Sequence, residues 1–214
     1  KMVLQILTYT HHTTTMLFGI FLSAFFLGVK QDKKNILQLL SLAVVSGILY
    51  VLCVLLFGTE TVDQIYPLIV HAPLLFVLVL HYKFRILPSL ISIFTAYLCC
   101  QCSNWMGLFA LALTGQEWCY YVCRILVTVG AFILLCRYVC QTTARLFAKT
   151  DRELLIIGSL PIIYYIFDYA TTKFSSLLYS GNKAVPEFLG FAMCLTYLLF
   201  LLVYFREYEM KNKA

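Results

Sequence analysis

The chain has 214 residues, of which 62% are hydrophobic and only 12% are charged, and its formal net charge is +6. A soluble domain is about one-quarter charged, so this chain has too little polar surface to cover a water-facing globule. No basic run is long enough to follow a phosphate backbone, and we expect no nucleic-acid partner. The composition therefore predicts a membrane protein whose first partner is the lipid bilayer.

Seven apolar stretches predict the transmembrane helices. A spanning helix needs about 20 residues, so a chain of this length holds six or seven of them with short loops. The predicted spans are 12–29, 36–58, 65–81, 88–102, 118–139, 154–173 and 187–205. The expected fold class is all-α: a polytopic membrane protein built as a bundle of about seven transmembrane helices.

The stretch 103–117 leaves the number of spans open. It fits an extension of the fourth span, a helix in the membrane interface, or a re-entrant turn. Trp105 and Trp118 bracket it, and aromatic residues of this kind are enriched at membrane interfaces. The sequence alone does not choose among the three arrangements.

Lys and Arg cluster in every second gap between the spans. The basic gaps are 30–35, 83–85, 137–152 and the tail 206–213, whereas 59–64, 114–117 and 174–186 are acidic or poor in charge. Cytoplasmic loops are enriched in Lys and Arg. The alternation therefore predicts that the N-terminus lies outside the cell and the C-terminus in the cytoplasm.

Two ionisable residues lie well inside predicted spans, Arg124 in the fifth and Asp168 in the sixth. Charges inside a membrane are costly, so both are functional candidates. The two spans run in opposite directions and place these residues at similar depth from the outer face. We therefore predict that they are neighbours, either as a structural ion pair that fixes helix register or as part of a ligand site.

Further polar residues occupy the outer halves of the spans, whereas the inner halves are mostly Leu, Ile, Val and Phe. The candidate ligand-binding residues are His71, Gln101, Asn104, Arg124, Tyr165 and Asp168. This one-sided distribution predicts a pocket open to the outside for an extracellular small molecule or peptide. Lys173 at the rim favours an anionic ligand, while His71 taken alone is more typical of a hydrogen-bonded core histidine than of a ligand-binding residue.

Nine cysteines are present, but the paired spacing of a zinc site is absent, so no metal site is predicted. Most are expected to pack between helices, and Cys102–Cys119 is the one disulfide that their outer position favours. Nucleophile elbows, phosphate-binding loops and zinc-protease motifs are also missing. We assign no catalytic residue and no cofactor to this chain.

The C-terminal segment 196–214, TYLLFLLVYFREYEMKNKA, passes from apolar to charged without Pro or Gly. Glu207 and Lys211 are spaced to pair on a helix. The last helix is therefore expected to continue beyond the membrane. This divides the chain into a multi-span region, 1–205, and the start of a cytoplasmic signalling helix, 206–214, with an output domain expected to follow.

Residues 161–214 resemble the last two spans of the N-terminal membrane region of bacterial sensor histidine kinases with a GHKL-type ATPase domain. The motifs are YYIFDYATT (164–172), LLYSGN (177–182), Glu187-Phe188 and the EYE-x-K exit (207–211). A looser match covers YPLIVHAPLL (66–75) and AYLCCQ (96–101). The resemblance implies a homodimer formed through the C-terminal helix, then a phospho-acceptor histidine and a kinase domain that binds ATP and Mg²⁺.

These patterns together predict the sensory module of a two-component system in the bacterial plasma membrane. The module would detect an extracellular ligand and relay it through its last helix, and only the full-length protein would be an enzyme. A small-solute transporter or permease subunit is the alternative, and an assembly protein without a ligand is a third. Transport needs access from both faces, and the apolar inner halves count against it.

Overall fold

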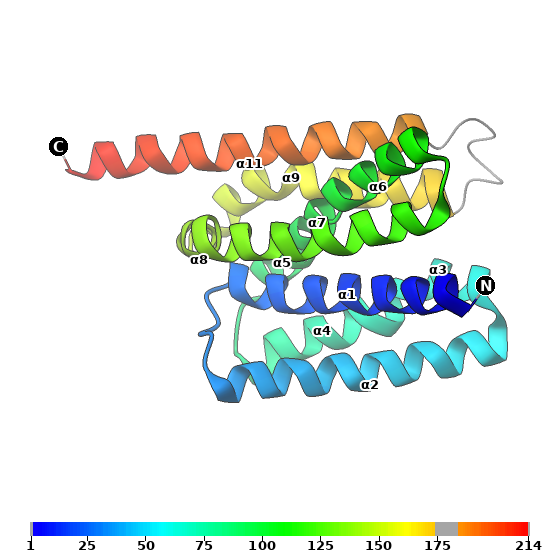
Figure 1. Ribbon diagram of the computed structural model, residues 1–214. Helices are drawn as coiled ribbons and strands as arrows, with labels where there is room; N and C mark the ends of the chain where they lie inside the picture. The colour runs from blue at the N-terminus through cyan, green and yellow to red at the C-terminus, as the bar shows by residue number, and fades with distance from the viewer. Residues whose placement is uncertain (1, 174–183, 214) are drawn as a thin grey trace.

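The computed structural model describes residues 2–173 and 184–213, and Figure 1 shows them as helices lying side by side in a bundle. Within these residues there is no β-strand. The long uninterrupted helices are α1 (Met2–Phe26), α2 (Lys33–Phe57), α7 (Glu117–Tyr138) and α11 (Ala184–Lys213). The predicted all-α fold is confirmed for this part of the chain.

The other long segments are built from shorter pieces. Segment 59–81 comprises α3 (Thr59–Tyr66), η1 (Pro67–His71), α4 (Ala72–Phe76) and η2 (Val77–His81), where η marks a π-helical stretch. α5 (Ile86–Cys99) is followed after Cys100 by α6 (Gln101–Thr114). α8 (Cys140–Phe147) leads to α9 (Asp151–Asp168), which continues as η3 (Tyr169–Lys173).

Six helices among the described residues are long and apolar enough to cross a membrane. They are Lys33–Phe57, Thr59–His81, Ile86–Thr114, Glu117–Tyr138, Asp151–Lys173 and Leu189–Lys211. The chain is therefore a multi-pass helical membrane protein. α1 is as long as α2, with 25 residues each, but residues 10–15 of α1 read THHTTT and make its first half polar.

One sequence-based boundary needs correction: the first helix begins at Met2, well before the expected residue 12. The threonine hydroxyls within it bond to carbonyls one turn earlier, as in Thr10 Oγ1 to Ile6 O at 2.8 Å, so these polar groups are paired inside the helix. Of the three arrangements left open for 103–117, the structure shows the first, an extension of the fourth span to Thr114. Gly115 ends it with a φ of +64°, a left-handed conformation that glycine adopts without strain.

The basic segments gather at one end of the bundle. Figure 1 shows the connections 27–32, 82–85 and 139–150 at the same end as the C-terminus, and we call this the basic end. The N-terminus, the α2–α3 junction at Gly58 and the turn at 115–116 lie at the opposite end. The gaps rich in Lys and Arg, which alternate with charge-poor gaps along the sequence, thus lie together at one end of the bundle axis.

α1 occupies a central position, in contact with α2, α5, α7 and α8. The second half of α1 is buried, with Ile20, Leu22 and Phe26 almost fully enclosed. The hydroxyl of Ser92 in α5 donates to the backbone carbonyl of Ser23 in α1. In lipid, helices associate through close packing and such hydrogen bonds, because the surrounding acyl chains are as apolar as leucine.

The contact between α5 and α9 depends on a small residue. A Cβ placed on Gly158 would lie 2.5 Å from Ile91 Cδ1, and Ile91 is fully buried. The absence of a side chain therefore lets the two backbones approach, as small residues do at transmembrane helix interfaces. This contact holds α9, and with it Asp168, against α5.

We predict that Gly158→Val lowers the free energy of unfolding by about 1–3 kcal/mol, because it overpacks the α5–α9 contact. The measurement is the unfolding midpoint of the purified protein in detergent. Gly130→Val is the matched control, since nothing lies within 4 Å of a Cβ at that position. Ile91→Ala should partly rescue Gly158→Val; equal losses for the two glycine variants would contradict the account.

Candidate functional site

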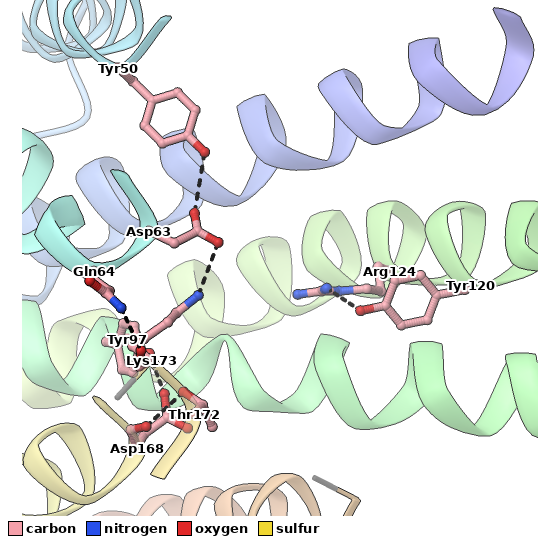
Figure 2. A network of polar contacts seen from close by, with 9 residues as sticks. All are labelled: Tyr50, Asp63, Gln64, Tyr97, Tyr120, Arg124, Asp168, Thr172 and Lys173. Carbon is pink, nitrogen blue, oxygen red and sulfur yellow. Dashed lines mark hydrogen bonds and ion pairs between the residues drawn. The ribbon is translucent and has the colours of Figure 1, made fainter. Parts of the chain in front are cut away.

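The buried carboxylate of Asp168 is the centre of the polar residues at the opposite end of the bundle. Asp168 is the last residue of α9 and is 7% exposed. Its Oδ2 accepts a hydrogen bond from the hydroxyl of Tyr97 in α5, and its Oδ1 lies 3.4 Å from the hydroxyl of Tyr164. Thr172 donates to the Asp168 backbone carbonyl at 2.7 Å, as Figure 2 shows. The hydroxyls of Tyr97 and Tyr164 therefore replace the hydrogen bonds to water that the Asp168 carboxylate loses on burial.

His71 and Tyr165 form the second contact of the same layer. His71 Nδ1 lies 2.8 Å from the Tyr165 hydroxyl. The His71 ring also meets the rings of Tyr66 and Tyr97 edge-on, with centroids 5.2 Å and 6.0 Å away. We call the whole layer the tyrosine cluster; its members are Tyr66, His71, Tyr97, Tyr164, Tyr165, Asp168 and Tyr169. It joins segment 59–81, α5 and α9–η3.

Two π-helical stretches adjoin this cluster. η1 ends at His71, and η3 begins directly after Asp168. Pro73 has no N–H to donate, which interrupts the α-helical ladder beside η1. π-helical turns inside α-helices are frequent at functional sites, because the extra residue re-aims the neighbouring side chains. In this chain the two π-helical stretches lie next to His71 and Asp168.

A partly exposed ion pair lies beside the cluster. Lys173 Nζ is 3.5 Å from Asp63 Oδ2, and the Tyr50 hydroxyl is 3.4 Å from Asp63 Oδ1. Gln64 Nε2 donates to the Lys173 backbone carbonyl at 3.2 Å. Figure 2 shows this chain of contacts from Tyr50 to Lys173. Since Asp63 offsets the charge of Lys173, the sequence-based argument that Lys173 favours an anionic ligand does not hold.

Arg124 belongs to a separate group on α6 and α7. Its Nη1 donates to the Tyr120 hydroxyl at 2.5 Å, and its Nη2 donates to Asn104 Oδ1. Asn104 Nδ2 in turn donates to Gln101 Oε1 at 3.0 Å. We call these four residues the arginine group. The buried Arg124 Nε has no hydrogen-bond partner among the described residues, so one donor of a charged side chain is left unsatisfied there.

The predicted pairing of Arg124 with Asp168 is wrong. Among the described residues the ion pairs are Arg85–Asp151, Arg145–Glu209, Lys149–Glu153 and Lys173–Asp63. Figure 2 draws Arg124 bonded to Tyr120 and Asp168 bonded to Tyr97, with no interaction marked between Arg124 and Asp168. The prediction rested on depth along each helix and not on which helices are neighbours: α7 packs against α6 and α1, whereas α9 packs against α5. Two residues at one depth can therefore lie on different sides of a bundle.

The six predicted site residues thus fall into two groups. His71, Tyr165 and Asp168 lie in the tyrosine cluster, and Gln101, Asn104 and Arg124 lie in the arginine group. Sequence reasoning missed Tyr97 and Asp63. Tyr164 was expected to share the helix face of Asp168, one turn away, but was not among the predicted site residues. His11 was not among them either, yet it is 4% exposed and its Nδ1 lies 3.4 Å from Thr15 Oγ1.

The cysteines form no disulfide, and all nine are free. The expected Cys102–Cys119 bridge is therefore wrong. Cys102 Sγ instead lies 3.5 Å from Cys194 Sγ in α11. The spacing argument considered residues near the outer face and overlooked α11, which packs against α6. No group of three or more His, Cys, Asp or Glu in the described ranges is placed to hold a metal ion.

Comparisons with protein-family models, with curated proteins and with solved structures found no match. The resemblance of 161–214 to a kinase sensor region therefore stays a prediction. Of its motifs, LLYSGN (177–182) lies outside the described residues, as does the side chain of Glu187. The site is accordingly argued from its own geometry.

We predict that Tyr97→Phe lowers the free energy of unfolding by about 2 kcal/mol, because it removes a hydrogen bond to a buried carboxylate. The measurement is the unfolding midpoint in detergent. Tyr9→Phe is the control, since Tyr9 is 71% exposed. The loss should shrink when Asp168 is already Asn, because the charge that needs the donor is then gone; identical effects of Tyr97→Phe and Tyr9→Phe would refute the role of Tyr97.

Within residues 2–173 and 184–213, Arg124 bonds to Tyr120 and Asn104 whereas Asp168 bonds to Tyr97 and Tyr164, so their substitutions should act independently. We predict that Arg124→Gln and Asp168→Asn lower the free energy of unfolding additively, within about 0.5 kcal/mol in the double variant. A double-mutant cycle on the purified protein measures this. A coupling well above that limit would restore the direct pairing that the sequence suggested.

Proposed function

We propose that the chain is the membrane-embedded sensory module of a bacterial two-component sensor histidine kinase. In this proposal it detects an extracellular small molecule or peptide and relays the signal through α11. The supporting observation is that α11 reaches from the tyrosine cluster to the basic end. Near one end Gly190 of α11 lies against the Tyr164 hydroxyl, and near the other Glu209 bonds to Arg145 of α8 at 3.0 Å.

The contact between Gly190 and Tyr164 links the packing of α11 to the hydrogen bonds of Asp168. A Cβ on Gly190 would overlap the Tyr164 hydroxyl, and that hydroxyl contacts Asp168 Oδ1. Any rearrangement that moves Tyr164 must therefore move α11 or change its packing. A ligand transmits a signal only if it binds two arrangements with different affinity. In our proposal the two arrangements differ in the hydrogen bonds of the tyrosine cluster.

The ligand-binding residues of the proposal are His71, Gln101, Asn104, Arg124, Tyr165 and Asp168. Arg124 supplies the reason to expect an acceptor on the ligand. Its partners Asn104 and Tyr120 are neutral, and its buried Nε has no acceptor in the part of the chain that the structure describes. A carboxylate, such as the C-terminus of a short peptide, would satisfy that donor and offset the charge.

The proposed topology has seven crossings, with the basic end in the cytoplasm of a bacterial cell. α1 counts as the seventh crossing because it packs against α2, α5, α7 and α8 and because His11 within its polar stretch is buried. By the resemblance, α11 would continue into a dimeric coiled coil and a GHKL-type kinase domain that binds ATP and Mg²⁺.

Topology is tested by reporter fusions in the plasma membrane of a bacterial host. Fusions after Lys34, Arg85 and Lys149 should report a cytoplasmic position, and fusions after Asp63 and Gln116 an external one. The reversed pattern would contradict the orientation. A mixed pattern would contradict the number of crossings.

The signalling role is tested with a chimera that joins the chain after Lys213 to the catalytic core of a well-behaved histidine kinase. Seven junctions, with zero to six inserted residues, sample every helical phase. Membrane vesicles are assayed for ATP-dependent autophosphorylation with and without concentrated medium from a dense culture of the source organism. At least one junction should respond, and Gly190→Leu should abolish the response while leaving membrane insertion intact. Seven unresponsive junctions would contradict the proposal.

A further inference from the structure

A groove between α8 and α11 lies at the basic end, away from the tyrosine cluster. Its volume is about 380 Å³, and its lining residues are Arg145, Leu146, Ala148, Lys149, Phe205, Tyr208 and Glu209. Arg145 and Lys149 lie one turn apart on the α8 side, and the α11 side is largely aromatic. The groove therefore combines two cations with an apolar wall.

The two cations differ in how far they are already engaged. Lys149 Nζ lies 3.1 Å from the Tyr204 hydroxyl, 4.1 Å from the centre of the Tyr208 ring and 3.5 Å from Glu153 Oε1. Arg145 is more open, since its side chain is 67% exposed and contacts Glu209 through Nη1 alone. A guanidinium carries five N–H donors, so Arg145 can accept a second, anionic partner.

The position of the groove identifies that partner. The apolar part of α11 ends at Phe205, and Arg206 begins its charged end. The groove therefore lies where the hydrocarbon of a membrane gives way to the headgroups. Leu202 and Val203, 42% and 56% exposed, continue the apolar surface of α11 toward the bilayer centre. A ligand with a phosphate at one end and an acyl chain at the other would match both features.

We propose that this groove binds the headgroup phosphate of an anionic phospholipid. Arg145 would bind the phosphate oxygens in its planar, two-donor geometry, and Lys149 would contribute a point charge. Basic pockets between transmembrane helices bind anionic headgroups in this way. The phosphate competes with Glu209 for Arg145, so the lipid loosens the α8–α11 contact. The inference rests on the groove alone and does not require the sensory function.

The experiment counts bound phospholipids by native mass spectrometry on the whole chain released from detergent. Phosphatidylglycerol is compared with phosphatidylcholine. For the double variant Arg145→Gln, Lys149→Gln we expect about 25-fold weaker binding of phosphatidylglycerol, or roughly fivefold for each charge. The matched control is Lys33→Gln, Lys34→Gln, which removes the same charge at the basic end outside the groove, and it should change binding less than twofold.

Glu209→Gln supplies a test that does not depend on a destabilising change. Removing the competing carboxylate frees Arg145, so binding of phosphatidylglycerol should become several-fold tighter. Equal binding of the two lipids, equal losses in the groove and control variants, or no gain in Glu209→Gln would each overturn the proposal. A soluble glycerol phosphate that displaces the lipid at a similar concentration would also overturn it, because the site would then recognise a free phosphate ester.

Discussion

The carboxylate of Asp168 is the constraint on which the arrangement of this bundle depends. A charge buried among apolar helices is costly unless donors surround it. Here the donors come from Tyr97 on α5 and Tyr164 on α9. Tyr165 extends the same layer to His71. Segment 59–81, α5 and α9 are thus fixed relative to one another by one polar layer, and Gly190 places α11 against that layer through Tyr164.

α11 makes different contacts at the two ends of the bundle. At the opposite end the helix contacts the tyrosine cluster, whose hydrogen bonds can be exchanged for those of a ligand. At the basic end it contacts α8 through Arg145–Glu209 and through Lys149 with Tyr204 and Tyr208. Between these contacts α11 is one continuous helix within Ala184–Lys213. A helix held at both ends can carry a displacement from one to the other, which links the proposed sensing residues to the proposed lipid groove.

Most of the fold could be predicted from the sequence, because the length of an apolar run and the charge of a loop can be read from the residues without knowing which helices pack together. The apolar runs located the helices, but the bounds were less accurate where polar residues lie inside a helix: THHTTT hid the start of α1, and the fourth span continues to Thr114. The site could be predicted only in part. Helical position gave Arg124 and Asp168 their depth, but their direction around the bundle depends on which helices pack together. Tyr97 carries no local signal at all. Tyr164 does, because it lies one turn before Asp168 on the same face of the helix.

The central claim is that Tyr164 at the tyrosine cluster and Tyr208 at the basic end are linked through α11. Fluorine NMR of protein labelled with 3-fluorotyrosine tests this most directly, with the Tyr208 resonance assigned by its loss in Tyr208→Phe. The account predicts that Tyr164→Phe shifts the Tyr208 resonance, whereas Tyr9→Phe leaves it in place. A Tyr208 resonance unchanged by Tyr164→Phe, in a sample where the Tyr97 resonance does move, would contradict the account.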